Sequence, residues 1–148
     1  MRKPAIALFI VFLTACSSGH TPRRTSPTSP PAVPSGPLQN GRLIFQSGSD
    51  AQGHQLTAAR PPLRPSCEAC HGVNGAGGIH IGGAVSADLR HSALVTQQKH
   101  PYTIALLERA ISTGIDNDGH PLSPVMPRWR MNTTDLHDVA QYVLTQLR

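Results

Sequence analysis

The chain has 148 residues, 39% of them hydrophobic, and a formal net charge of +5 at pH 7. The basic excess lies before residue 38, because residues 38–148 hold all eight acidic residues and nine of the Lys and Arg residues. A domain so close to neutrality, without a basic patch interleaved with aromatic residues, gives no support for nucleic-acid binding.

The N-terminus has the pattern of an export signal. The basic pair Arg2-Lys3 is followed by nine consecutive apolar residues, Ala5–Leu13, and by small residues before Cys16. A transmembrane helix needs about 20 apolar residues, so this run is too short to span a bilayer. We predict that residues 1–15 are a bacterial lipoprotein signal peptide and that Cys16 becomes the lipidated first residue. An ordinary secretory signal cut near the same place is the alternative.

Residues 16–37 are predicted to be a disordered linker behind the lipidated cysteine. Ser, Thr, Pro and Gly account for 16 of the 21 residues in Ser17–Pro37, so almost nothing apolar is available to form a core. A polyproline-like chain extends by about 3.1 Å per residue, which lets this segment hold a domain up to roughly 65 Å from its anchor. Its proline spacing would also suit a recognition domain, but a spacer is the favoured interpretation.

Residues 38–148 are long enough for one small domain. Three segments have apolar residues at helical spacing and predict helices over 40–47, 102–113 and about 134–147, the last behind a threonine cap at Thr133 or Thr134. The connections are rich in Gly and Pro, and the only strand signal is a possible short hairpin near residues 55–58.

The most specific motif is Cys67-Glu68-Ala69-Cys70-His71. Two thiols at this spacing, with an imidazole directly after them, suit a haem whose vinyl groups become thioethers while His71 ligates the iron. A disulfide between Cys67 and Cys70 would not need the histidine, and a zinc site usually takes a second pair of ligands. The chain has three cysteines, and Cys16 accounts for the third. The motif therefore predicts one covalent haem c.

The composition of the domain fits a bound apolar group. Residues 38–148 contain four aromatic residues against eleven glycines and seven prolines, which is little material for a core. A haem would supply the missing apolar mass, so we expect the domain without haem to be marginally stable or unfolded.

The order of these motifs resembles that of the class I c-type cytochromes over essentially all of residues 38–148. The resemblance implies an all-α fold of three to five helices wrapped around one covalently attached haem. It also implies that the first and last helices cross, with Gly41 and Phe45 near Tyr142. The matching stretches are Gly41-x-x-x-Phe45, Cys67-x-x-Cys70-His71-Gly72, Pro124-Val125-Met126-Pro127-Arg128-Trp129 and Asp135-Leu136-x-x-Val139-Ala140-x-Tyr142-Val143.

Met126 is the candidate for the second axial ligand of the iron. Its soft thioether would favour Fe(II) and raise the potential relative to a second histidine. It stands between Pro124 and Pro127, in a loop that is stiff but not helical. Met131 and His120 are the competing candidates.

Two further roles follow from the resemblance. A ligating histidine donates its second ring N–H to an oxygen. Relatives supply this oxygen near a proline, but Val85–Leu89 has no proline, so a backbone carbonyl of Ser86 or Ala87 would accept the bond here.

Trp129 and Arg128 follow the methionine, where relatives place groups that bind haem propionates. For the arginine, a simple surface charge is an equal alternative.

Taken together, these features predict a lipid-anchored monohaem c-type cytochrome on the periplasmic side of a bacterial membrane. It would be an electron carrier rather than an enzyme, with redox proteins as its partners: a dehydrogenase or quinol-oxidising complex as donor, and an oxidase or reductase as acceptor. A haem subunit of a periplasmic dehydrogenase complex is one alternative. A gas- or peroxide-binding haem protein with an open sixth position is the other.

Overall fold

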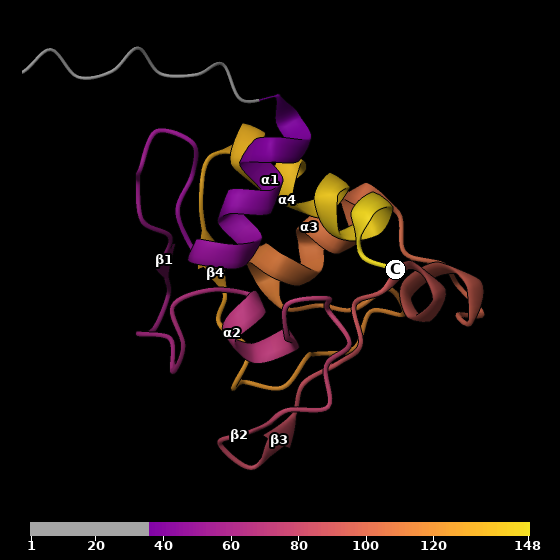
Figure 1. The fold of residues 1–148 in the computed structure, drawn as a ribbon. Coiled ribbons are helices and arrows are strands. Elements are labelled where there is room, and N and C mark those ends of the chain that lie inside the picture. The colour runs from indigo at the N-terminus through magenta and orange to yellow at the C-terminus, as the bar shows by residue number, and fades with distance from the viewer. Residues whose placement is uncertain (1–35) are drawn as a thin grey trace, which may run out of the picture. The chain divides into compact units, whose positions relative to one another are not determined.

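The computed structural model describes residues 36–148, so the predicted signal peptide, Cys16 and nearly all of the linker lie outside the described residues. In the described part, helices predominate and the strands are only two residues long (Figure 1), which confirms the predicted all-α fold. The helices are α1 (Pro37–Ser47), α2 (Glu68–His71), the π-helical turn η1 (Ser92–Thr96), α3 (Ile104–Thr113) and α4 (Thr133–Gln146), and the strands are β1 (Thr57–Ala58), β2 (His80–Ile81), β3 (Ala84–Val85) and β4 (Trp129–Arg130).

Helices α1 and α3 end as their sequences predict. Gly48 and Gly114 follow the two helices in the left-handed conformation, with φ of 73° and 74°. Glycine adopts this conformation without the steric cost of a Cβ. Helix α1 begins at Pro37, three residues earlier than predicted, because proline is well suited to a first helical turn whose N–H groups have no partner inside the helix.

The N-terminal cap of α4 differs from the prediction. Asn132 is the capping residue, and its side-chain oxygen accepts a hydrogen bond of 2.9 Å from the backbone N–H of Asp135. The Asn132 amide returns a bond of 2.7 Å to the Asp135 carboxylate. Thr133 and Thr134 therefore lie inside the helix, and the reciprocal Asn132–Asp135 pair satisfies the first turn.

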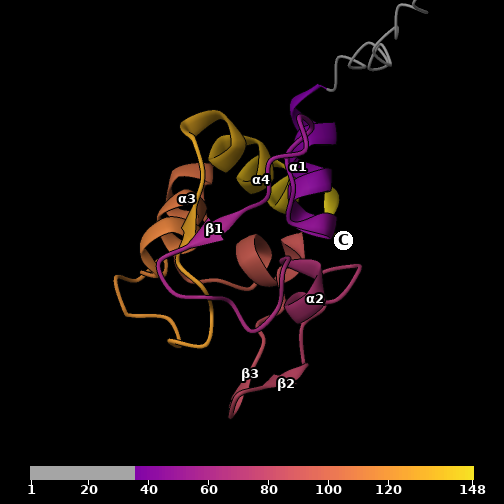
Figure 2. The same ribbon diagram turned by 90° about the vertical axis from the view of Figure 1, so that its left-hand side faces the viewer.

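The first and last helices, α1 and α4, pack against each other as the resemblance predicted (Figures 1 and 2). They approach most closely at Gly41. A Cβ at Gly41 would overlap the backbone carbonyl of Asp138 and lie 2.8 Å from the Cβ of Tyr142. One turn further along α1, the Phe45 ring packs against the Tyr142 ring at a centroid distance of 5.7 Å. The glycine thus lets the two backbones approach closely enough for these rings to meet.

A buried polar network ties α1 to the start of α4. The Asn40 amide nitrogen donates to the Asp135 carboxylate and to the Asp138 carboxylate, both at 2.8 Å. The Asn40 oxygen accepts a bond of 2.8 Å from the backbone N–H of Ala51. All three side chains are less than a tenth exposed, so these bonds offset much of the cost of burying two carboxylates.

The hydrophobic core joins the three long helices. Ile44, Phe45 and Val139 are its largest fully buried side chains. Helix α3 faces this core with Leu107, Ala110 and Ile111, the residues that its sequence spacing placed on one side. Some apolar residues of α3 and α4 also face the segment that carries the CxxCH motif.

The strands pair differently from the sequence prediction. Near the hairpin expected at residues 55–58, a tight antiparallel turn forms in which Gln55 bridges Ser49, while β1 pairs antiparallel with the distant β4. A hairpin does form from β2 and β3, and Figure 2 shows it extending away from the α1–α4 pair. In the described residues 36–148, no helix is long and apolar enough to cross a membrane.

Candidate functional site

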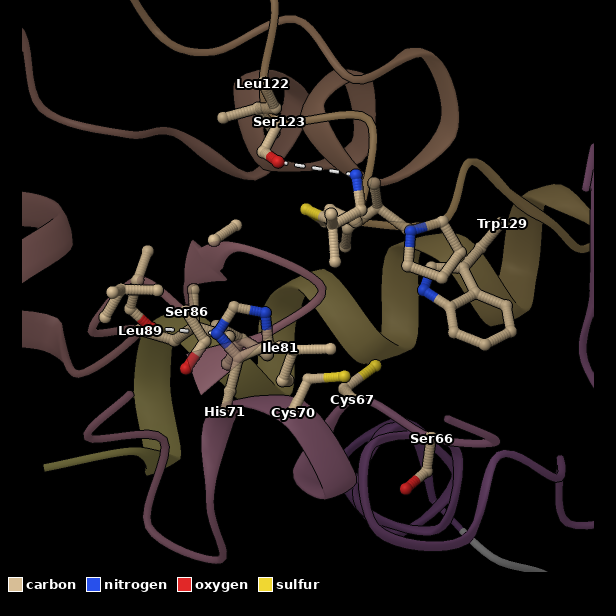
Figure 3. Close-up of a pocket in the computed structure, with 18 of the residues that line it drawn as sticks. Ser66, Cys67, Cys70, His71, Ile81, Ser86, Leu89, Leu122, Ser123 and Trp129 are labelled. Atoms are coloured by element: carbon tan, nitrogen blue, oxygen red, sulfur yellow. Dashed lines mark hydrogen bonds between the residues drawn. The ribbon is translucent and has the colours of Figure 1, made fainter. Parts of the chain in front are cut away.

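A large apolar cavity lies between α2, the β2–β3 hairpin and the loop 122–127. Its empty volume is about 1060 Å³, with the open mouth included. Figure 3 shows Cys67, Cys70 and His71 along one side and Leu122, Ser123 and Trp129 across from them. The apolar lining comes from the hairpin, α3 and α4: Ile81, Ala84, Val85, Leu107, Ile111, Val139 and Val143. A cavity with this lining suits a mostly apolar ligand.

Helix α2 brings the CxxCH motif to one wall. Cys67 caps the helix, and its carbonyl accepts bonds from the backbone N–H groups of Cys70 at 3.1 Å and of His71 at 2.8 Å. Residues three and four apart on a helix share a face, so all three side chains line the cavity. The structure therefore brings together the residues that the sequence singled out for haem attachment.

The two cysteines of the motif are not joined in a disulfide. Burial raises the pKa of Cys67 to about 12. Burial also raises the pKa of Cys70, although the charge of Arg64 acts in the opposite direction. Both sulfur atoms line the cavity, where they could form thioether links to a haem.

The His71 ring is nearly buried and held in one tautomer. Its Nδ1 lies 2.8 Å from the carbonyl oxygen of Ala87, and a carbonyl can only accept, so Nδ1 carries the proton. Burial lowers the pKa of His71, with the Ala87 bond acting in the opposite direction, so the ring is neutral at neutral pH. Nε2 is then left unprotonated, which is the form able to ligate a metal.

The Ala87 carbonyl is positioned by backbone pairing instead of a proline. Gly77 N–H donates to the His71 carbonyl at 2.8 Å, and Gly78 N–H donates to the Ser86 carbonyl at 2.9 Å. A Cβ at Gly77 would overlap the Ala87 carbonyl, so this glycine lets the two segments approach. Of the two carbonyls that the sequence left open, Ala87 is the one bonded to His71.

The opposite wall carries Met126 in a tight turn. Met126 N–H donates to the Ser123 carbonyl at 3.1 Å, and the Met126 side chain lines the cavity. The competing candidates are placed elsewhere: Met131 packs against the hydrophobic core, and His120 has a 75% exposed side chain beside Asp116. Of these three residues, Met126 alone reaches the cavity.

Trp129 and Arg128 have different environments. Trp129 is 5% exposed and lines the cavity. Arg128 does not line it, because its guanidinium turns toward the backbone of the loop 122–127 and donates to the carbonyls of Leu122 and Met126. The predicted propionate role therefore stays a prediction for Trp129, and the guanidinium of Arg128 is already engaged.

Sequence reasoning missed the hairpin residues Ile81, Ala84 and Val85, which line the cavity next to His71. Strands of two residues are too short for a periodicity signal, and only the glycine pair Gly82-Gly83 between them hinted at a turn. The lining residues of α3, Leu107 and Ile111, could be found from the helical spacing.

Comparison with known proteins agrees with this geometry. The cytochrome c family model matches residues 48–146, which is well over half of the chain and includes the CxxCH motif, Met126 and α4. No curated protein matches the chain. The apolar cavity, with its two free cysteines and the histidine on one wall, fits the covalently bound haem c of that family. The chain belongs to the cytochrome c family and is a haem-based electron-transfer protein.

Proposed function

We propose that the protein is a monohaem electron carrier in which Cys67 and Cys70 would form the thioether links and His71 and Met126 would ligate the iron. The observation that carries this proposal is that His71 and Met126 both line one apolar cavity. Figure 3 shows His71 on one side of it and Ser123, from the loop that carries Met126, on the other. The two segments are 55 positions apart in sequence.

When bound, the haem supplies a one-electron Fe(III)/Fe(II) couple. The chain contributes the surroundings that decide how this couple is used. With a His71 imidazole and a Met126 thioether both bound, the iron would have no open position for a gas, a peroxide or a substrate. The residues around the site are mostly apolar, and the thioether would favour the reduced state relative to a second histidine. These properties suit electron transfer without further chemistry.

The proposal is tested by an optical redox titration of the haem-loaded protein beside Met126→Ala, with Met131→Ala as the control. We expect the Met126 variant to lose the methionine-ligated spectrum, to fall in potential and to bind CO in the ferrous state, while the control behaves as wild type. If the wild-type ferrous protein binds CO quickly and stoichiometrically, the protein has an open sixth position and belongs with gas- or peroxide-binding haem proteins.

We further propose that the domain is tethered by a lipid on Cys16 at the periplasmic side of a bacterial membrane. The apolar run, the small residues before Cys16 and the proline-rich segment behind it support this location. A tethered domain would exchange electrons with a donor dehydrogenase or quinol-oxidising complex and with an acceptor oxidase or reductase. Wild type should fractionate with membranes and Cys16→Ser with the soluble periplasmic contents; membrane retention of Cys16→Ser would contradict the lipid anchor.

A further inference from the structure

Arg128 closes the turn that carries Met126. Its Nη1 donates to the Met126 carbonyl at 2.6 Å, and its Nη2 donates to the Leu122 carbonyl at 2.9 Å. A longer contact of 3.4 Å joins Nη1 to the Ser123 carbonyl. Every hydrogen bond that the structure gives this guanidinium therefore goes to the backbone of the loop 122–127, and none goes to a carboxylate.

Gly114 makes room for this arrangement. The guanidinium lies over Gly114, the left-handed residue that ends α3, and a Cβ there would overlap the Nε and Cζ atoms of Arg128. The Gly114 carbonyl in turn accepts a bond of 2.8 Å from the backbone N–H of Leu122. The end of α3, the arginine and the start of the loop are thus one connected unit.

The loop has few other constraints. Pro124 and Pro127 have no N–H to donate, and the remaining bonds within the turn are Met126 N–H to the Ser123 carbonyl and a 3.3 Å bond from Val125 N–H to the Ser123 hydroxyl. A guanidinium has donors in a fixed planar fork, so it can hold two carbonyls at a set separation, which a flexible ammonium cannot do. Its charge also strengthens each bond to a carbonyl.

We propose that Arg128 is a positioning residue that holds the Met126 side chain at the haem iron, and that Gly114 is required because it seats the guanidinium. This inference rests on the ligation by Met126 proposed above. Without the fork, the turn opens more often, and Met126 leaves the iron for a larger fraction of the time. Arg128 thereby keeps the sixth position closed to external ligands.

The test compares Arg128→Leu and Arg128→Lys with Arg130→Leu in the haem-loaded full chain. Arg130 is two residues away and exposed, so its substitution removes the same charge without touching the turn. The readouts are the rate of CO binding to the ferrous protein and the midpoint potential. We expect Arg128→Leu to bind CO at least about tenfold faster than Arg130→Leu, as fits the loss of charge-assisted hydrogen bonds. Arg128→Lys should lie between the two.

A second pair of variants separates the position of the guanidinium from its charge. Gly114→Ala keeps Arg128 but displaces it, and Gly119→Ala is the control because Gly119 also has a positive φ, of 90°, with open space around it. Both variants carry the backbone strain of a non-glycine residue in this conformation. Only Gly114→Ala should accelerate CO binding.

The outcomes distinguish this inference from the proposed function. If Met126→Ala leaves the spectrum and potential unchanged, the ligand assignment is wrong and the role of Arg128 falls with it. If Met126→Ala binds CO but Arg128→Leu binds CO no faster than Arg130→Leu, the assignment of Met126 as ligand is kept and the positioning role of Arg128 is overturned. A shift in potential for Arg128→Leu without faster CO binding would also overturn it, because that is the result expected of a propionate partner.

Discussion

The Nδ1 atom of His71 and the carbonyl oxygen of Ala87 form a 2.8 Å hydrogen bond across sixteen residues of chain. This bond sets the tautomer of His71 and aims its other ring nitrogen. Because the acceptor is a backbone oxygen, its position depends on the path of the chain around Ala87 and not on the Ala87 side chain. Gly77, which packs directly against that carbonyl, controls the path.

Gly77→Ala is therefore expected to disturb the haem site. A Cβ at Gly77 would push the Ala87 carbonyl away from His71, in addition to the strain of a φ of 64°. We expect a loss of about 1–3 kcal/mol in unfolding free energy beyond that of Gly78→Ala, and a changed midpoint potential. Gly78 is the matched control, because its φ is 77° and nothing lies near its Cβ position. Equal effects of the two substitutions on stability and potential would contradict the role of Gly77.

Gly41→Ala tests the crossing of α1 and α4. In an ordinary helix interior this substitution stabilises by about 1 kcal/mol. Here the added methyl group would collide with the Asp138 carbonyl, so we expect a destabilisation of about 1–3 kcal/mol by urea unfolding. Arg42→Ala, at the exposed neighbouring position, should change stability by less than about 0.5 kcal/mol. A stabilised Gly41→Ala protein would show that the helices separate at little cost.

Asn40→Ala should strongly destabilise the domain. The substitution removes the amide that donates to the buried carboxylates of Asp135 and Asp138, and it leaves both with fewer partners. We expect a loss of about 2–4 kcal/mol in chemical unfolding. Asn74→Ala is the control, since Asn74 is exposed and only accepts a bond from the backbone of Ala76. A loss no larger than that of the control would show that water replaces the amide.

The stability of the domain should depend on pH through Asp50. Burial by itself would raise the pKa of Asp50, but the backbone N–H and ring of His54 and the N–H of Gln52 donate to its carboxylate, and the net effect is a pKa below the ordinary value of 3.8. The unfolded chain therefore binds a proton at higher pH than the folded chain. The contribution of Asp50 is complete above that ordinary value and is lost as the pH falls through the folded pKa.

Urea unfolding of wild type and Asp50→Asn from pH 7 down to pH 3 measures this contribution. We expect wild type to be the more stable of the two at pH 7, and the difference to shrink below about pH 4. A difference that stays constant over the whole range would mean that the carboxylate contributes through shape alone.

Removal of the haem should weaken the domain greatly. Without it, the apolar residues of α3, α4 and the loop 122–127 that line the cavity have no occupant to pack against. We expect the double variant Cys67→Ser with Cys70→Ser to lack covalent haem and to melt with low cooperativity, because large unfilled apolar cavities cost several kcal/mol. Differential scanning calorimetry of the variant beside the haem-loaded wild type checks this. A sharp transition near the wild-type temperature would contradict it.

The sequence alone was sufficient for the features that depend on near neighbours along the chain. The CxxCH motif, the helix faces of α3 and α4 and the glycine stops at Gly48 and Gly114 are set by spacings of a few residues. The helix faces follow from the repeat of the α-helix, and the helix ends follow from the conformational preference of glycine. The family resemblance added the crossing at Gly41, because that contact joins segments about 100 residues apart.

Only the tertiary structure could decide which groups far apart in the chain meet. It selected Ala87 over Ser86 as the partner of His71, paired β1 with β4, and brought Met126 rather than Met131 or His120 to the cavity. It also turned Arg128 toward the Met126 turn, whereas the resemblance had left a haem propionate and a simple surface charge as equal alternatives. Such choices depend on how the helices pack around the cavity, because a backbone carbonyl or a flexible arginine has many possible partners until packing excludes all but a few.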